Sequence, residues 1–175
     1  VPSRLVLNEE IHEAVFKDLI PSARRFVWIA TADLKDLHYQ RTARKFDTFL
    51  ALLDDLVSDG VEIRLIHAKE PGPRFRKDFD RFPSLIESDR FERVLCPRNH
   101  MKCVIVDGTR SFLGSANLTG AGMGAKSVTR RNFECGMIAD EADQVAPLMD
   151  MFDRLFMGDF CPKCDRRDVC PDPIL

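Results

Sequence analysis

The sequence predicts an α/β protein in which helices flank a central β-sheet in layers. Two observations predict this class. Segments with helical spacing of apolar residues alternate along the chain with short runs of β-branched and other apolar residues, which is typical of layered α/β domains. We interpret most of these runs as strands that are buried on both faces of a sheet. With 175 residues, the chain has the length of one domain with a sizeable core.

The first half is expected to hold helices and strands separated by a polar loop. Asn8 is positioned to cap the first helix, which should end near Pro21. Gly60 ends the second helical pattern. In chain order, we expect a helix at 9–20, a strand at 26–30, a loop at 33–45, a helix at 46–57 and a strand at 61–66.

The second half begins at Pro71-Gly72-Pro73, which breaks the chain. A phenylalanine-rich helix should follow, interrupted at Pro83, and a turn is expected at Asp107-Gly108. The remaining expected elements are strands at 91–95, 100–106, 111–113 and 135–139 and a closing helix at 142–156.

The segment from the expected strand at 100–106 onwards carries the clearest functional signal. His100 and Lys102 are two positions apart, so on a strand their side chains point the same way. A nucleophile and a cation then share one face. Further polar residues and a glycine follow at fixed offsets, and the complete pattern is His100, Lys102, Asp107, Gly114, Ser115 and Asn117.

This pattern resembles the signature of the phospholipase D superfamily. The single copy of this motif is similar to the family's small dimeric nuclease-type branch, and Asn132-Phe133-Glu134 resembles its downstream Asn-x-Glu element. The resemblance implies a layered sandwich with a mixed central β-sheet flanked by helices. It also implies a phosphodiesterase that forms a covalent phosphohistidine and needs no cofactor for catalysis.

Residue chemistry agrees with these roles. Phosphoryl transfer redistributes negative charge over the phosphate oxygens, which Lys102 and Asn117 are suited to stabilise. An imidazole attacks phosphorus through an unprotonated nitrogen, and a carboxylate on its other nitrogen would orient the ring. We therefore expect His100, Lys102, Asn117 and Glu134 to be catalytic, with Glu134 as that carboxylate.

Four further residues complete the expected site. Ser115 and Lys126 are expected to bind substrate, Ser115 through its hydroxyl group and Lys126 from a basic loop beside the proposed site. Asp107 is expected to hold the hairpin through its own backbone rather than contact phosphate. Gly114 is expected to shape the backbone near the phosphate.

The family mechanism uses two histidines, whereas this chain has one copy of the motif. None of His12, His38 and His67 is followed two residues later by lysine in a similar context. The resemblance therefore implies a homodimer in which two motifs meet across a two-fold axis.

We expect a catalytic domain at 1–158 and a cysteine-containing tail at 159–175. Cys161, Cys164 and Cys170 have a spacing that suits structural zinc. A redox pair, a disulfide, an iron–sulfur site and inert thiols are the alternatives. Cys103 and Cys135 should pack as small apolar groups. The candidates for a fourth zinc ligand are Cys96, His38 and His67.

The composition excludes a strong net positive charge that would attract nucleic acid, because the chain has 26 basic and 28 acidic residues. Any such affinity must come from local patches. No apolar stretch is long enough to span a bilayer, so we expect a soluble, cytoplasmic protein. The start at Val1 leaves room for a trimmed targeting segment or a preceding domain.

Three functional classes follow. The first is a nuclease acting on DNA or RNA. The second is a phospholipase D or transphosphatidylase acting on phospholipid, for which the chain offers no basic amphipathic anchor. The third is a nonenzymatic nucleic-acid-binding module. Kinship of fold alone does not choose between substrates.

Overall fold

The computed structural model describes residues 3–35, 37–42 and 44–174. One seven-stranded sheet and one two-stranded sheet form within these residues. The strands are β1 (Ser3–Leu7), β2 (Phe26–Thr31), β3 (His38–Thr42), β4 (Lys45–Thr48), β5 (Glu62–His67), β6 (Phe91–Leu95), β7 (Cys103–Val106), β8 (Arg110–Gly114) and β9 (Cys135–Ala139). The α-helices are α1 (Glu9–His12), α2 (Phe49–Ser58), α3 (Pro73–Phe79), α4 (Pro83–Glu87) and α5 (Ala142–Phe156). Shorter or wider helical segments are η1 (Glu13–Leu19), η2 (Ile20–Ser22), η3 (Cys161–Lys163) and η4 (Arg167–Val169).

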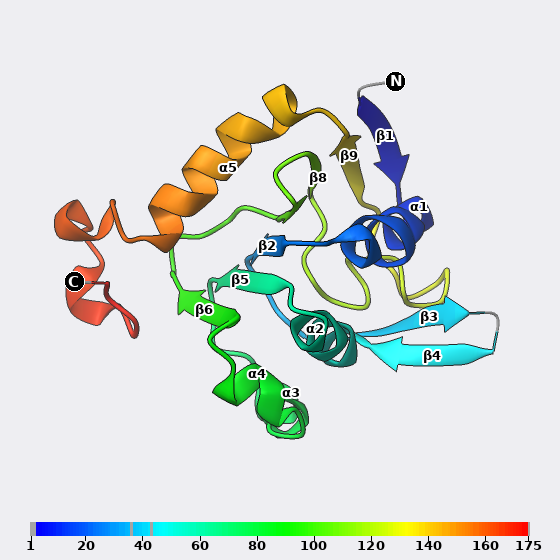
Figure 1. Cartoon of the computed structure of the whole chain (residues 1–175), viewed down its shortest axis with the longest axis horizontal. Helices are drawn as coiled ribbons and strands as arrows, with labels where there is room; N and C mark the ends of the chain where they lie inside the picture. The colour runs from blue at the N-terminus through cyan, green and yellow to red at the C-terminus, as the bar shows by residue number, and fades with distance from the viewer. Residues whose placement is uncertain (1–2, 36, 43, 175) are drawn as a thin grey trace.

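The large sheet is mixed and has the order β1-β9-β8-β7-β2-β5-β6. Strands β2, β5 and β6 are parallel, and β7 pairs antiparallel with β2. From β7 the sheet continues antiparallel through β8 and β9 to β1. Helix α5 lies on one side of the sheet, and α1 and α2 lie on the other (Figure 1). These findings confirm the predicted layered α/β sandwich with a mixed central sheet.

The alternation of side chains along β2 builds a core on each face of the sheet. Val27 and Ile29 belong to the larger cluster, which includes the apolar faces of α1, η1 and α2. Trp28 points the other way and stacks on Phe152 of α5, with ring centroids 5.2 Å apart. Phe152 is fully buried, and burial of a side chain of this size contributes about 3 kcal/mol.

The expected loop at 33–45 is wrong, because the described part of this segment contains β3 and pairs with β4 as a hairpin. Tyr39 is 2% exposed and stacks on Phe16, which anchors the hairpin to the core. Phe46 lies in β4 and is 67% exposed, so the helix expected from this residue begins only at Phe49. Thr48 caps that helix by accepting a hydrogen bond from the Ala51 N–H at 3.2 Å.

The start of the chain also differs from expectation. Asn8 makes no side-chain cap and has a φ of 49°. Its side-chain oxygen accepts the Glu134 N–H at 3.0 Å instead, which joins the end of β1 to the start of β9. Strand β1 was not predicted, because only Val6 is fully buried among its alternating residues. In β9, Ile138 is buried but Met137 is 41% exposed, so this strand is covered on one face only.

Candidate active site

His100 and Lys102 lie in the segment between β6 and β7 rather than on a strand, because β7 begins only at Cys103. Their side chains nevertheless converge. The Lys102 Nζ is 3.4 Å from the His100 Nδ1 and 3.4 Å from its Nε2. The same ammonium group donates a hydrogen bond to the His100 carbonyl oxygen at 2.9 Å. His100 is exposed and Lys102 is buried. An accessible imidazole therefore lies next to a cation that the fold holds in place.

Burial changes the acidity of this cation. Desolvation lowers the pKa of the Lys102 ammonium group from its usual value, and the negative charge of Glu134 opposes that effect. Glu134 is thus close enough to Lys102 to interact with it electrostatically. The net direction is downward, because burial is the larger influence.

Asn99 fixes the segment that carries His100, a role that sequence reasoning missed. It is 3% exposed. Its Nδ2 donates to the Thr31 carbonyl oxygen at 2.9 Å, and its Oδ1 accepts the Met101 N–H at 3.2 Å. The only signal in the sequence was a polar residue directly before the motif histidine.

Thr31, the last residue of β2, joins the two halves of the motif. Its carbonyl oxygen accepts the hydrogen bond from the Asn99 Nδ2, while its Oγ1 accepts the Leu118 N–H at 2.9 Å. The same hydroxyl group donates to the Asp33 carbonyl oxygen at 2.7 Å. The loops carrying His100 and Asn117 therefore meet at the carboxyl end of a central strand, where α/β sheets commonly bind ligands.

The side chain of Asn117 is held through its carbonyl oxygen. The Oδ1 accepts the backbone N–H groups of Ala32 and Asp33, each at 3.2 Å. Within the described residues, no hydrogen bond involves the Nδ2 of Asn117. The amide therefore offers its two donors to a ligand, as the predicted role requires.

Gly114 and Ser115 connect the motif to β9. The Gly114 N–H donates to the Lys102 carbonyl oxygen at 3.1 Å. A Cβ at Gly114 would lie 2.6 Å from the Cys135 carbonyl oxygen, so only glycine permits this approach. The Ser115 hydroxyl group bonds to the Glu134 carboxylate and accepts the Cys135 N–H at 3.1 Å.

The other Glu134 oxygen accepts a hydrogen bond from the Asn132 Nδ2 at 3.1 Å. Among the described residues, neither carboxylate oxygen bonds to the His100 ring. The structure thus brings Glu134 to Ser115 and into the field of Lys102. Its orientation of the imidazole stays a prediction.

Lys126 lies beside the site and lines a cavity of about 430 Å³. Lys35 and Arg74 also line this cavity, as does Asp33, whose N–H binds Asn117. Over the described ranges, none of these three cations forms an ion pair. This basic cavity, which Asp78 also lines, therefore adjoins the amide of Asn117.

Asp107 occupies the turn between β7 and β8, away from His100. Its carboxylate accepts the backbone N–H groups of Arg24, Arg25 and Phe26 at 2.9, 2.8 and 2.9 Å. Asp107 and Gly108 have φ values of 53° and 74°, the left-handed pair that a tight hairpin requires. The residue holds the start of β2 as well as its own turn.

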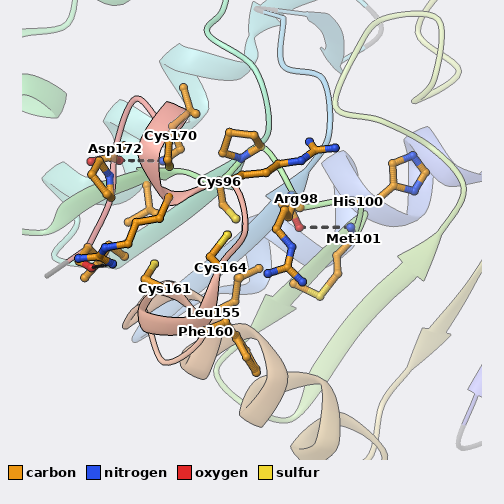
Figure 2. Close-up of a pocket in the computed structure, with 18 of the residues that line it drawn as sticks. Cys96, Arg98, His100, Met101, Leu155, Phe160, Cys161, Cys164, Cys170 and Asp172 are labelled. Atoms are coloured by element: carbon orange, nitrogen blue, oxygen red, sulfur yellow. Dashed lines mark hydrogen bonds between the residues drawn. The ribbon is translucent and has the colours of Figure 1, made fainter.

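Four of the six cysteines line one cavity, and the other two lie elsewhere. Cys161, Cys164 and Cys170 line one cavity together with Cys96 and His100 (Figure 2). As the side chains stand, no group of three or more His, Cys, Asp or Glu in the described residues could hold a metal ion. Cys103 packs in the core as predicted, and burial raises its pKa to about 12. Cys135 is exposed, so its expected packing is wrong.

In the described parts of the chain, no helix has both the length and the apolar character needed to cross a bilayer.

The family described as cardiolipin synthase, PLD-like domain, matches residues 16–156. Comparison of the sequence with curated proteins finds no significant match.

Solved structures share the fold at low identity. NucT from Helicobacter pylori has a TM-score of 0.63 and 16% identity, with 87% of this chain and 93% of that chain covered. Nuc from Salmonella typhimurium, a phospholipase D family member, has a TM-score of 0.57 and 14% identity, with 99% of each chain covered. TrmBL2, an archaeal chromatin protein with a novel mode of DNA binding, has a TM-score of 0.61 and 14% identity, with 89% of this chain and 52% of that chain covered.

Proposed function

The chain belongs to the phospholipase D-like family, and from this membership we propose that it is a nuclease that cleaves phosphodiester bonds through a phosphohistidine on His100. The observation that carries the proposal is the contact between an exposed imidazole and a buried ammonium group, with the Lys102 Nζ 3.4 Å from both ring nitrogens. A cation in this position meets the phosphate oxygens when the imidazole meets phosphorus.

In the first step, a ring nitrogen of His100 bonds to phosphorus and the bond to the leaving oxygen breaks. Lys102 and the free amide donors of Asn117 stabilise the charge that gathers on the phosphate oxygens. The leaving oxygen needs a proton, and the described residues place no second imidazole beside His100. His100 of the partner subunit supplies that proton in the proposed homodimer.

In the second step, water attacks phosphorus and the phosphorus–nitrogen bond breaks. The partner's His100, now neutral, removes the proton of the water. His100 returns to its starting state with its electron pair restored. The proposed cycle consumes one water molecule and requires no metal ion.

A row of exposed apolar side chains supports the pairing of two chains. Leu5, Met137 and Leu113 lie opposite one another across β1, β9 and β8. They are 60%, 41% and 48% exposed. Phe133, next to Glu134, is 96% exposed. A second copy of the chain would remove this apolar surface from water, and the row lies on strands that adjoin the site.

The cavity lined by Lys35, Arg74 and Lys126 supports a nucleic acid substrate. A strand whose scissile phosphate lies at His100 carries further phosphates on either side. Unpaired cations beside Asn117 suit those neighbouring charges, and their contribution would weaken as salt is raised. A single-headgroup lipid would have no second phosphate to place there.

The test compares the wild-type protein with His100→Ala on single- and double-stranded DNA and RNA, phospholipid vesicles and bis(p-nitrophenyl) phosphate. We expect cleavage of nucleic acid and of the generic diester by the wild type only. Hydrolysis of vesicles without nucleic acid cleavage would favour the lipid enzyme. Tight DNA binding with no hydrolysis of any substrate would favour a nonenzymatic binding module.

Mixed dimers test the shared site. When equal amounts of wild-type and His100→Ala chains assemble at random, a site that needs both histidines survives in about a quarter of the dimers, whereas independent sites would retain about half of the activity. A fully active monomer in light scattering would contradict the proposed assembly.

Charge reversal tests the basic cavity. We expect Lys35→Glu, Arg74→Glu and Lys126→Glu each to weaken strand binding and to lower the slope of log affinity against log salt by roughly 0.7. Lys77→Glu is the matched control, because it is exposed on the same helix as Arg74 but does not line the cavity.

A further inference from the structure

The chain folds back on itself after α5, and this return segment has almost no core of its own. Neither of its short helical turns, η3 and η4, contains a buried residue. Among the described residues, one side-chain hydrogen bond ties it to the sheet, from the Leu95 N–H of β6 to the Asp172 carboxylate at 2.9 Å. Segments of this kind usually depend on a covalent or metal crosslink for their stability.

Three of the side chains that this segment turns inward are thiols. Cys161, Cys164 and Cys170 are each partly buried, whereas their immediate neighbours Pro162, Lys163 and Asp165 are exposed. The thiols line a cavity of about 390 Å³ (Figure 2).

Cys96 enters the same cavity from a distant part of the chain. It follows β6 directly, and its N–H donates to the His67 carbonyl oxygen at 2.9 Å. Figure 2 shows the Cys96 and Cys164 side chains pointing toward one another. His38 and His67, the other candidates for a fourth ligand, do not line this cavity. The fold therefore selects Cys96 from the three.

Positively charged side chains surround the cavity, which favours thiolates. Arg98, Arg166 and Arg167 all line the cavity.

We propose that Cys96, Cys161, Cys164 and Cys170 bind one structural Zn²⁺ ion as four thiolates. Tetrahedral zinc with four cysteines is a common closed structural site, and Cys-x-x-Cys supplies two adjacent ligands. On binding, the four thiols release their protons to solvent, which leaves a net charge of −2 on the site. The three arginines that line the cavity offset that charge.

The sulfur atoms have to approach one another for this site to form, because no group of three among the described residues could hold a metal as the side chains stand. A change of χ1 rotamer moves a cysteine sulfur without moving the backbone. Metal binding and closure of the segment are thereby coupled, as in other small zinc-dependent segments.

The location of Cys96 gives the proposed metal a consequence for the active site. Cys96 lies four positions before His100, and its carbonyl oxygen accepts the N–H of the buried Asn99 at 2.9 Å. The zinc would thus fix both the return segment and the start of the loop that presents His100. It would contact neither substrate nor the reacting atoms.

The test measures metal in protein purified without chelator, by mass spectrometry of the metal content. We expect one zinc per chain. Replacement by Co²⁺ should give the visible absorption and the sulfur-to-metal charge-transfer band of a tetrahedral thiolate site. Cys96→Ser should weaken zinc binding by more than the roughly 10–100-fold that loss of an outer contact costs, and Cys135→Ser should leave it unchanged.

Two results would overturn the proposal. One is full zinc affinity in Cys96→Ser, which would remove Cys96 from the ligands. The other is metal-free protein that binds no added ZnCl₂ while its cysteines react as free thiols or are joined in disulfides. Neither result depends on phosphodiesterase activity, so failure of this proposal and failure of the proposed function are distinguishable.

Discussion

The Lys102 Nζ lies 3.4 Å from each ring nitrogen of His100 and 2.9 Å from the carbonyl oxygen of the same residue. The short bond to the backbone holds the ammonium group independently of the imidazole. The ring can therefore take on a phosphoryl group while the cation keeps its position, which is the preorganisation that electrostatic catalysis requires.

Replacement of this cation is the first prediction. Lys102→Met retains the length and apolar stem of the side chain but removes the charge. We expect kcat for bis(p-nitrophenyl) phosphate to fall by about 10²–10³-fold, the cost of losing one donor to a developing oxyanion. The thermal unfolding midpoint should change little. Lys77→Met is the control, and a kcat within a factor of two of the wild type would contradict the role of Lys102.

The second prediction concerns pH. Burial lowers the pKa of Lys102 and Glu134 partly restores it. Activity that needs the charged ammonium group should therefore fall on the alkaline side below the usual lysine value of about 10.4. Glu134→Gln removes the opposing charge, so it should move the alkaline limb of kcat/KM to still lower pH.

Glu87→Gln is the control for this shift, because Glu87 is exposed on α4, away from the motif. A uniform loss of rate at every pH, with an unmoved alkaline limb, would instead favour the predicted orienting role of Glu134.

Much of the fold followed from hydrophobic spacing. Helix α5 has the predicted bounds, and β2, β5, β6 and β8 lie within one or two residues of expectation. The apolar residues of these elements recur with the spacing of a strand or of one helix face, so local pattern and tertiary packing agree.

The elements that were missed have few buried apolar residues or depend on partners that are distant in the sequence. The β3–β4 hairpin reads as polar because few of its side chains enter the core, with Tyr39 as the main anchor. Asn8 has the residue type of a helix cap, yet the Glu134 N–H occupies its oxygen. A partner 126 positions away in the sequence cannot be inferred from local propensity.

The motif residues were identifiable because their spacing is fixed, but the residues that hold them were not. The side chains of Asn99 and Thr31 hold the motif residues by forming hydrogen bonds with backbone groups. Such bonds place few constraints on sequence pattern, so the fold alone exposes them.

The third prediction tests Thr31 as a positioning residue. Thr31→Val keeps the shape but leaves the Leu118 N–H without its buried acceptor, which should cost about 1–3 kcal/mol of stability. Because the Asn117 loop loses that anchor, kcat should also fall while KM changes less. Thr31→Ser restores the hydroxyl group and should recover kcat. Equal urea midpoints and rates for all three proteins would remove Thr31 from this role.

The last prediction concerns Asp107 and acid stability. Burial alone would raise the pKa of this carboxyl group, but the backbone N–H groups of Phe26, Arg25 and Arg24 and the charge of Arg25 outweigh it, so the pKa is lowered. A lowered folded-state pKa means that the carboxylate stabilises the fold above its unfolded value of about 3.9, and that this contribution is lost as pH falls through the folded value. Asp107→Asn should therefore lower the free energy of unfolding near neutral pH by about 1–3 kcal/mol, and the deficit should shrink as the pH drops below about 3.9.

Urea denaturation at several pH values measures this difference. Asp89→Asn serves as the control, because Asp89 is an exposed carboxylate outside the β7–β8 turn. Since Asp107 joins the β7–β8 turn to the start of β2 rather than to the phosphate site, the variant should keep its kcat wherever it remains folded. A deficit that persists unchanged at pH 3 would mean that the amide loses shape complementarity in the turn, not the charge on which the three N–H groups converge.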